Sequence, residues 1–194
     1  MLTHGNLIAN LIQCNMLLGD EFDEFERKNE QPVIMTALPL YHIFSFTVCG
    51  MFGLYRGCIG LLVPNPRDLP SLIKAYKDYP PAFFPAVNTL FTALANNAEF
   101  KSLDHSKLVS SMGGGMAVLG STAEQWQQVT GNVISQGYGL SETAPVATAT
   151  PWVAPFLMVR LVYQYLAPML RSWMKKAMKW PWVSVVRLVF VVRR

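Results

Sequence analysis

The chain has 194 residues, 52% of them hydrophobic and 14% charged, which is enough for one domain with a hydrophobic core and excludes extensive disorder. The net charge of +4 is unevenly placed. Residues 1–151 hold 8 Lys or Arg and all 12 acidic residues, a net charge of −4, whereas residues 152–194 hold the other 8 basic residues and no acid, a net charge of +8.

Up to about residue 150, helical and extended hydrophobic patterns alternate along the chain. The helix at 43–55 is apolar nearly all round and is expected to be buried. Such alternation predicts an α/β fold with a mostly parallel sheet and flanking helices. We expect strands at 33–38, 59–63, 82–84, 108–112 and 133–136, and helices at 6–18 (with Leu7, Ile8, Leu11, Ile12 and Met16 on one face), 43–55, 68–76 (capped by Asp68), 89–96 and 121–129.

The three cysteines, Cys14, Cys49 and Cys58, lie in apolar surroundings and share no metal-ligand spacing. This pattern indicates buried, reduced thiols of an intracellular protein. The N-terminus has no basic region followed by an apolar run, so we expect no secretory signal.

Residues 136–143 carry the strongest candidate chemistry. A Gly–Tyr–Gly turn after an apolar strand would expose backbone amides and then present the Ser141 hydroxyl and the Glu142 carboxylate. Ser141 could donate to a phosphate oxygen, and Glu142 could hold Mg²⁺ directly or through water. The alternative, which the motif leaves open, is an ordinary strand, turn and helix capped by Ser141.

Two other stretches are weaker signals when taken alone. Gly113, Gly114 and Gly115 follow a strand, where they would let a flat ligand approach the backbone or would form only a tight turn. His42 lies among apolar and aromatic residues between Leu38 and Phe44, where a histidine is more often a core residue than a catalytic one.

The order and spelling of these stretches resemble AMP-forming acyl-CoA synthetases, and bacterial long-chain fatty acid–CoA ligases most closely. The resemblance covers residues 1 to about 156 and departs from the family at Ser141, where threonine is usual. Five blocks carry it: 1–6, after the family's glycine-rich phosphate loop; 38–44, its substrate gate; 86–91, its acyl pocket; 113–116, its adenine loop; and 138–142, its signature block.

The resemblance implies part of the large N-terminal domain of the adenylate-forming fold. It also implies a two-step ligase reaction, in which a fatty acid and ATP give an acyl-adenylate and pyrophosphate, and coenzyme A then displaces AMP. ATP, Mg²⁺, coenzyme A and a fatty acid are the implied ligands, with no nucleic acid, in a cytoplasmic protein that touches the inner face of the membrane at most peripherally.

The resemblance also assigns roles to residues of this sequence. Gly113, Gly114, Gly115 and Gly139 would lie near the nucleotide, and Tyr138 would stack on adenine. Ser141 would hold the α-phosphate and Glu142 the Mg²⁺, while His42 would border the acyl carboxylate. Asn88 and Phe91 would lie near the acyl channel.

The resemblance stops after Phe156, where the family continues Asn-Gly-Ser-Ile-Gly-Leu-Pro-Val-Pro. A shifted reading frame from Leu157 permits that continuation, so we hypothesise that residues 157–194 are an out-of-frame translation product. The basic tail taken as written would instead suit an anionic membrane surface.

The phosphate loop and the family's later segments are not in the sequence, so we expect the chain alone to show no ligase turnover. Two alternatives stay open: a non-enzymatic α/β protein that binds a membrane or a partner, and a synthetase fragment for another carboxylic acid.

Overall fold

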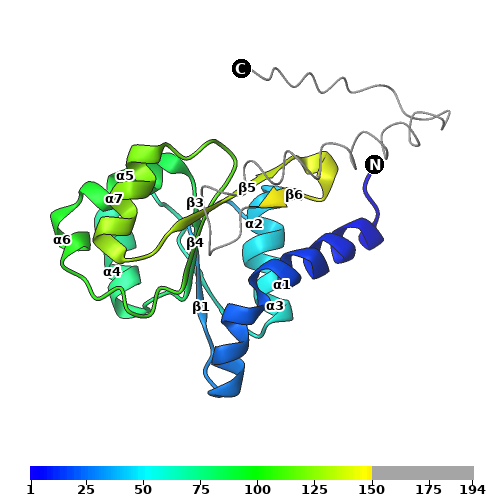
Figure 1. Ribbon diagram of the computed structural model, residues 1–194, viewed down its shortest axis with the longest axis horizontal. Helices are drawn as coiled ribbons and strands as arrows, with labels where there is room; N and C mark the ends of the chain where they lie inside the picture. Colours follow the sequence, from blue (N-terminus) through cyan, green and yellow to red (C-terminus); the bar gives the residue numbers. More distant parts are fainter. Residues whose placement is uncertain (150–194) are drawn as a thin grey trace. The chain divides into compact units, whose positions relative to one another are not determined.

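The computed structural model describes residues 1–149, so the proposed tail at 157–194 lies outside the described residues (Figure 1). In this part of the chain one six-stranded sheet has the order β2-β1-β3-β4-β5-β6. Strands β1 to β5 are parallel and β6 is antiparallel to β5, which confirms the mostly parallel sheet. The strands are β1 Val33–Thr36, β2 Ile59–Leu62, β3 Phe83–Ala86, β4 Ser110–Gly113, β5 Ile134–Gly139 and β6 Val146–Ala149.

Helices cover both faces of the sheet (Figure 1). One face carries α1 (His4–Arg27) and a continuous helical segment made of α2 (Ile43–Ser45), a π-helical turn η1 (Phe46–Met51) and α3 (Phe52–Tyr55). The other face carries α4 (Leu69–Asp78), α5 (Asn88–Asn96), α6 (Ala98–Lys101) and α7 (Gly120–Thr130).

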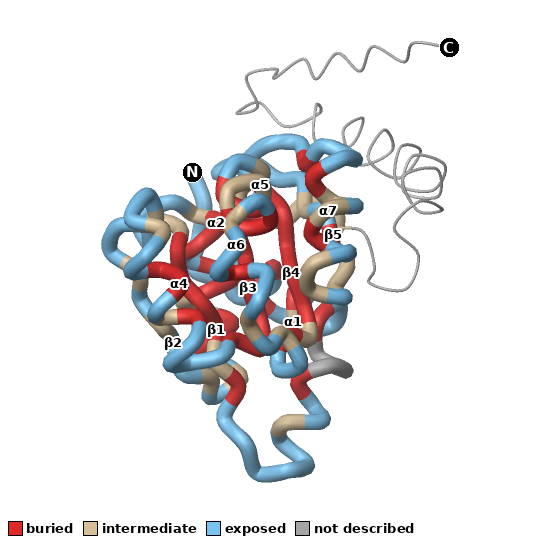
Figure 2. Tube along the Cα trace, turned by 90° about the vertical axis from the view of Figure 1, so that its left-hand side faces the viewer, coloured by how far each residue is buried: buried red, intermediate tan, exposed pale blue. Residues whose placement is uncertain are grey.

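The strands separate two hydrophobic cores because successive strand residues point to opposite faces. On β3, Phe83 packs into the core under α1 and α3, and the next residue, Phe84, packs into the core under α4 to α7. The strands therefore form the middle layer in Figure 1, and Figure 2 shows the buried residues of β4 in red.

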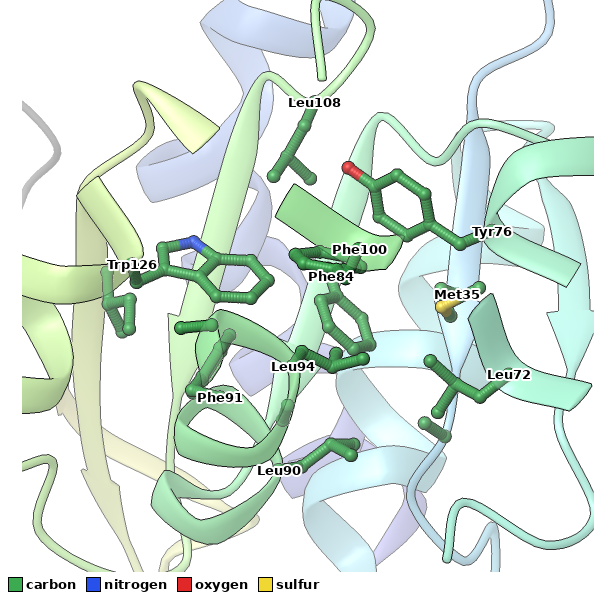
Figure 3. Close-up of a cluster of buried hydrophobic side chains, with 14 of the residues drawn as sticks. Met35, Leu72, Tyr76, Phe84, Leu90, Phe91, Leu94, Phe100, Leu108 and Trp126 are labelled. Atoms are coloured by element: carbon green, nitrogen blue, oxygen red, sulfur yellow. The ribbon is translucent and has the colours of Figure 1, made fainter. Parts of the chain in front are cut away.

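Aromatic side chains fill the larger core (Figure 3). The Phe91 ring meets Trp126 edge to face with ring centroids 4.8 Å apart, and Phe100 stacks on Trp126 at 5.5 Å. The Trp126 indole N–H donates to the Ser111 hydroxyl at 3.0 Å, so this buried polar group is satisfied.

Local signals set the helix ends. Thr3 and Asn6 form a reciprocal capping box at the start of α1. Asp68 caps α4 as expected, accepting from the Ser71 backbone N–H at 3.3 Å. Helix α7 ends at Gly131, which takes a left-handed φ of 73°.

The apolar face predicted for the first helix is wrong in part. Helix α1 buries Leu11, Cys14, Leu18 and Phe22, which are spaced three or four residues apart. The predicted side chains of Ile8, Ile12 and Met16 are instead exposed, because they lie on a flank of the helix that does not face the sheet.

The 43–55 segment is helical but is not buried all round. Phe44, Val48 and Phe52 face the core, whereas Phe46 and Leu54 are exposed. Strand β6 and the short helix α6 were not predicted, because α6 has only four residues and β6 lacks the apolar run that marks β1.

The direction in which the chain crosses the sheet reverses between β1 and β3. From β1 the chain crosses to β2 on one side, through α2 to α3. From β3 the chain runs in the opposite direction along the sheet to β4, through α5 and α6 on the opposite face. The carboxyl ends of β1 and β3 are thus a topological switch point, where α/β sheets bind ligands.

Candidate functional site

The loops after β1, β3, β4 and β5 meet at this carboxyl edge, because these strands are parallel. They carry His42, Asn88, Gly114 and Gly115, and the segment around Ser141. Four of the five separated blocks in the sequence therefore come to one edge of the sheet.

The glycine loop after β4 is shaped by close packing. A Cβ on Gly114 would lie 2.9 Å from two atoms of the Phe44 ring, and one on Gly113 would overlap the Val118 side chain. Gly115 has a φ of 76°, in the left-handed region that favours glycine. The loop thus combines a tight turn with a close approach, but the close neighbours at Gly113 and Gly114 belong to the protein itself.

His42 is exposed, so the reading of a satisfied core histidine is wrong. It caps α2, with its Nδ1 accepting from the Phe44 backbone N–H at 3.2 Å. Nδ1 therefore carries no proton in this conformation, and Nε2 does. The exposed side chains of Leu40 and Tyr41 precede it.

Asn88 and Phe91, both on α5, play different parts. The Asn88 side-chain oxygen accepts from the Leu119 backbone N–H at 2.9 Å and so holds the loop between β4 and α7. Phe91 is fully buried between Phe84 and Trp126, so it contributes to the core and not to the open edge (Figure 3).

The Gly137–Tyr138–Gly139 stretch is not the predicted turn. It lies in β5 and pairs with β6, with a shift of the pairing register between Tyr138 and Gly139. The turn comes later, as a 3₁₀ helix over Ser141–Thr143, and Ser141 does not act as its cap. The stretch extends as a strand because β6 supplies backbone partners that no local pattern reveals.

Ser141 and Glu142 are both exposed at the tip of the β5–β6 connection, and Tyr138 is 50% exposed. Thr143 closes the connection: its hydroxyl accepts from the Leu140 N–H at 2.8 Å and can donate to the carbonyl oxygen of Leu140 or Pro145. A Cβ on Gly139 would overlap the Pro145 carbonyl, so this position requires glycine.

The sequence reasoning missed Asn10, which holds this connection from α1. Its side chain makes two hydrogen bonds with the backbone of Val146, 136 residues away. No local pattern could have found a contact of this separation.

The possible metal ligands at this edge fit an ion that is shared with a bound phosphate better than an ion held entirely by protein side chains. In the part of the chain that the structure describes, no three His, Cys, Asp or Glu side chains cluster at metal-binding distance. One exposed carboxylate, Glu142, beside the Ser141 hydroxyl suits Mg²⁺, which is often held by one or two carboxylates together with water and substrate phosphates.

A separate hollow of about 500 Å³ lies near the opposite edge of the sheet, between the end of α1 and the start of β1. Its lining includes Glu26, Glu30 and Arg56, but none of the predicted site residues.

Among residues 1–149 no helix has the length and hydropathy needed to cross a bilayer.

Comparisons with known proteins show to which family the chain is similar. The family model described as AMP-binding enzyme matches residues 1–161. A long-chain-fatty-acid–CoA ligase of Escherichia coli O6:H1 is 44% identical over 152 residues, which cover 78% of this chain and 26% of that ligase. The chain thus spans about a quarter of the length of this relative.

Solved structures share the fold. ATP-bound MatB from Rhodopseudomonas palustris matches with a TM-score of 0.62 and 21% identity, over 79% of this chain and 28% of that protein. A fatty acyl-adenylate ligase from L. pneumophila, solved with acyl adenylate and pyrophosphate, matches with a TM-score of 0.59 and 22% identity, over 78% and 27% of the two chains. These matches confirm the predicted fold class.

Proposed function

The chain belongs to the AMP-binding enzyme family, and we propose that its carboxyl-edge loops form the nucleotide-facing part of a long-chain fatty acid–CoA ligase. The convergence of four sequence blocks at the switch point of the sheet carries this proposal. The 44% identity to a ligase of that specificity supports the fatty acid as the acyl substrate.

On this proposal the β5–β6 connection handles the phosphates of ATP. The Ser141 hydroxyl donates to an α-phosphate oxygen, and the half-exposed Tyr138 ring stacks on adenine. The exposed Glu142 carboxylate would hold Mg²⁺, directly or through water, and a bound ion would supply positive charge that offsets the charge of the phosphates. Gly139 lets the β5–β6 connection close against Pro145. The glycine loop of Gly113, Gly114 and Gly115, which packs against Val118 and Phe44, would lie beside adenine.

The acyl carboxylate would lie beside His42. Its Nε2–H group takes no part in the hydrogen bond by which Nδ1 caps α2, so it can donate to a carboxylate oxygen. Exposed apolar side chains around this edge, including Leu40, Tyr41 and Met116, suit an aliphatic chain. Asn88 contributes by holding the loop that carries Met116, and Phe91 contributes through the core.

Coenzyme A would be the acyl acceptor, in a cytoplasmic protein with peripheral membrane contact at most. Segments of the relatives outside the matched quarter would complete the reaction. We therefore propose that this chain alone forms no acyl-CoA. Oleoyl-CoA made by the purified chain from ATP, oleate and coenzyme A would contradict that.

Amide hydrogen exchange with and without ATP and Mg²⁺ tests the nucleotide site. The proposal predicts added protection in 113–119 and 137–145, with no change in the hollow near Glu30 at the other edge. Protection confined to other segments, or none at millimolar ATP, would refute the proposed site.

A further inference from the structure

The Asn10 side chain is a buried clamp between α1 and the β5–β6 connection. Only 4% of Asn10 is exposed. Its Nδ2 donates to the Val146 carbonyl at 2.7 Å, and its Oδ1 accepts from the Val146 N–H at 3.0 Å. Nδ2 also donates to Gln13 Oε1 at 3.1 Å, and the Cys14 thiol approaches Oδ1 at 3.9 Å. Every hydrogen-bonding capacity of the carboxamide is therefore used.

The segment that this clamp holds is backbone-strained. Ala144, two residues before Val146, has a φ of 68°, which a residue with a Cβ rarely adopts. Such a conformation persists where neighbouring contacts over-determine it. Thr143 fixes the connection from within, and Asn10 fixes its end at Val146 from a separate element.

The backbone that Asn10 holds lies close in sequence to two residues of the proposed site. Ser141 and Glu142 lie five and four residues before Val146, on the short connection that returns from β5 to β6. Among residues 1–149, the connection also has local hydrogen bonds that involve Leu140, Ser141, Thr143, Ala144 and Pro145. Loss of the Asn10 contacts would therefore remove the link to α1 and leave Val146 with its pairing to β5 and the local contacts of the connection.

We infer that Asn10 is a positioning residue, which sets the place of the Ser141 hydroxyl and the Glu142 carboxylate through the backbone of Val146. The inference rests on the proposed function only for what those two groups bind. Helix α1 would then be part of the phosphate-handling apparatus through a side chain that contacts the Val146 backbone and not the ligand.

Only the asparagine carboxamide has both the length and the donor and acceptor that the two hydrogen bonds with Val146 require. Alanine removes both Val146 contacts, and aspartate keeps an acceptor for the Val146 N–H but offers no donor to its carbonyl. Asn132 provides a matched control, since its Nδ2 donates to the Val109 carbonyl at 2.7 Å and holds a loop before β5, at the opposite edge of the sheet.

The test uses the full chain and two measurements on Asn10→Ala, Asn10→Asp and Asn132→Ala. The first is amide hydrogen exchange at 141–146, compared with exchange in β3 as a measure of global stability. The second is titration with ATP in the presence and absence of Mg²⁺. We expect both Asn10 variants to exchange at least about tenfold faster at 141–146, and to bind Mg²⁺–ATP about tenfold more weakly.

Asn132→Ala should leave both quantities near those of the unsubstituted chain. Unchanged exchange at 141–146 in a folded Asn10 variant would overturn the inference, and so would an equal loss of binding in Asn132→Ala. If Asn10→Ala does not fold, Asn10→Asp decides by the same exchange measurement. If the unsubstituted chain binds no ATP, the proposed function fails, and exchange at 141–146 still decides whether Asn10 positions this segment.

Discussion

The Phe44 ring lies directly over Gly114, so that a Cβ on Gly114 would be 2.9 Å from the ring atoms Cε1 and Cζ. This contact joins the loop after β1, which carries His42, to the glycine loop after β4. Gly114→Ala would force the nearly buried Phe44 ring to move. We expect a loss of about 1–3 kcal/mol in the free energy of unfolding, measured in urea.

Gly120→Ala is the matched control for this substitution. Gly120 begins α7, and a Cβ there meets no atom within 4 Å. Alanine should therefore stabilise the protein slightly, by about 0.4–1 kcal/mol. If the two alanine variants lost the same free energy, the Phe44–Gly114 contact would not be the cause.

His105 should make stability depend on pH. Its Nε2 lies 3.1 Å from the Phe100 carbonyl, so Nε2 carries the proton and Nδ1 accepts from the Tyr76 hydroxyl at 2.9 Å. Burial lowers the pKa of His105, against the opposing effects of the Phe100 carbonyl and Asp104. The folded state thus favours neutral His105, and its stabilisation is full above the unfolded pKa of about 6.5 and lost as the pH falls through the lower folded value.

Urea unfolding between pH 7 and pH 5.5 checks this dependence. The free energy of unfolding should fall with pH in the unsubstituted protein. His105→Phe, which cannot titrate, should show a shallower slope in the same range even though it is less stable. A slope that His105→Phe leaves unchanged would assign the pH dependence to other groups.

The cysteine thiols should be unreactive in the folded protein. Burial raises the pKa of Cys14, Cys49 and Cys58 to about 11 in each case. Only the thiolate is alkylated, so at pH 8 each should react with iodoacetamide about two orders of magnitude more slowly than a free cysteine. Mass spectrometry should find Cys58 modified first, because it is the most exposed of the three. Rapid alkylation of Cys49 in the folded protein would contradict its burial.

The exposed flank of α1 should tolerate polar residues. Ile8, Ile12 and Met16 are 51%, 48% and 79% exposed. Replacing all three with glutamine should leave the urea midpoint nearly unchanged and reduce self-association in sedimentation velocity. Leu11→Ala, on the buried side of the same helix, should cost about 2–5 kcal/mol. A large loss from the triple glutamine variant would show that the flank is packed.

Elements with strong local signals could be predicted from the sequence. The Asp68 cap and the pair Leu72 and Ile73 predict helix α4, and short apolar runs predict β1 and β3. Helix α1 has apolar residues on two flanks, so its period predicts a helix but not which flank meets the sheet.

The site was predictable only in part for a related reason. The residue types at 113–115 and 141–142 indicate phosphate and metal chemistry. Both segments follow strands of a parallel sheet, so they are expected at the same edge of that sheet. The pairing of β5 with β6, the Asn88–Leu119 bond and the Asn10 clamp join segments far apart in sequence. Such contacts depend on the complete fold and leave no local pattern.

Magnesium-dependent ATP binding tests the central claim most directly. Isothermal titration of the full chain with ATP, with and without Mg²⁺, would compare the unsubstituted protein with Glu142→Gln and with Glu124→Gln, a control on α7 outside the proposed site. The proposed site predicts that Mg²⁺ tightens ATP binding, that Glu142→Gln abolishes this tightening, and that Glu124→Gln preserves it. Equal Mg²⁺ dependence in all three proteins, or no binding by the unsubstituted chain, would contradict a nucleotide site at the carboxyl edge of this sheet.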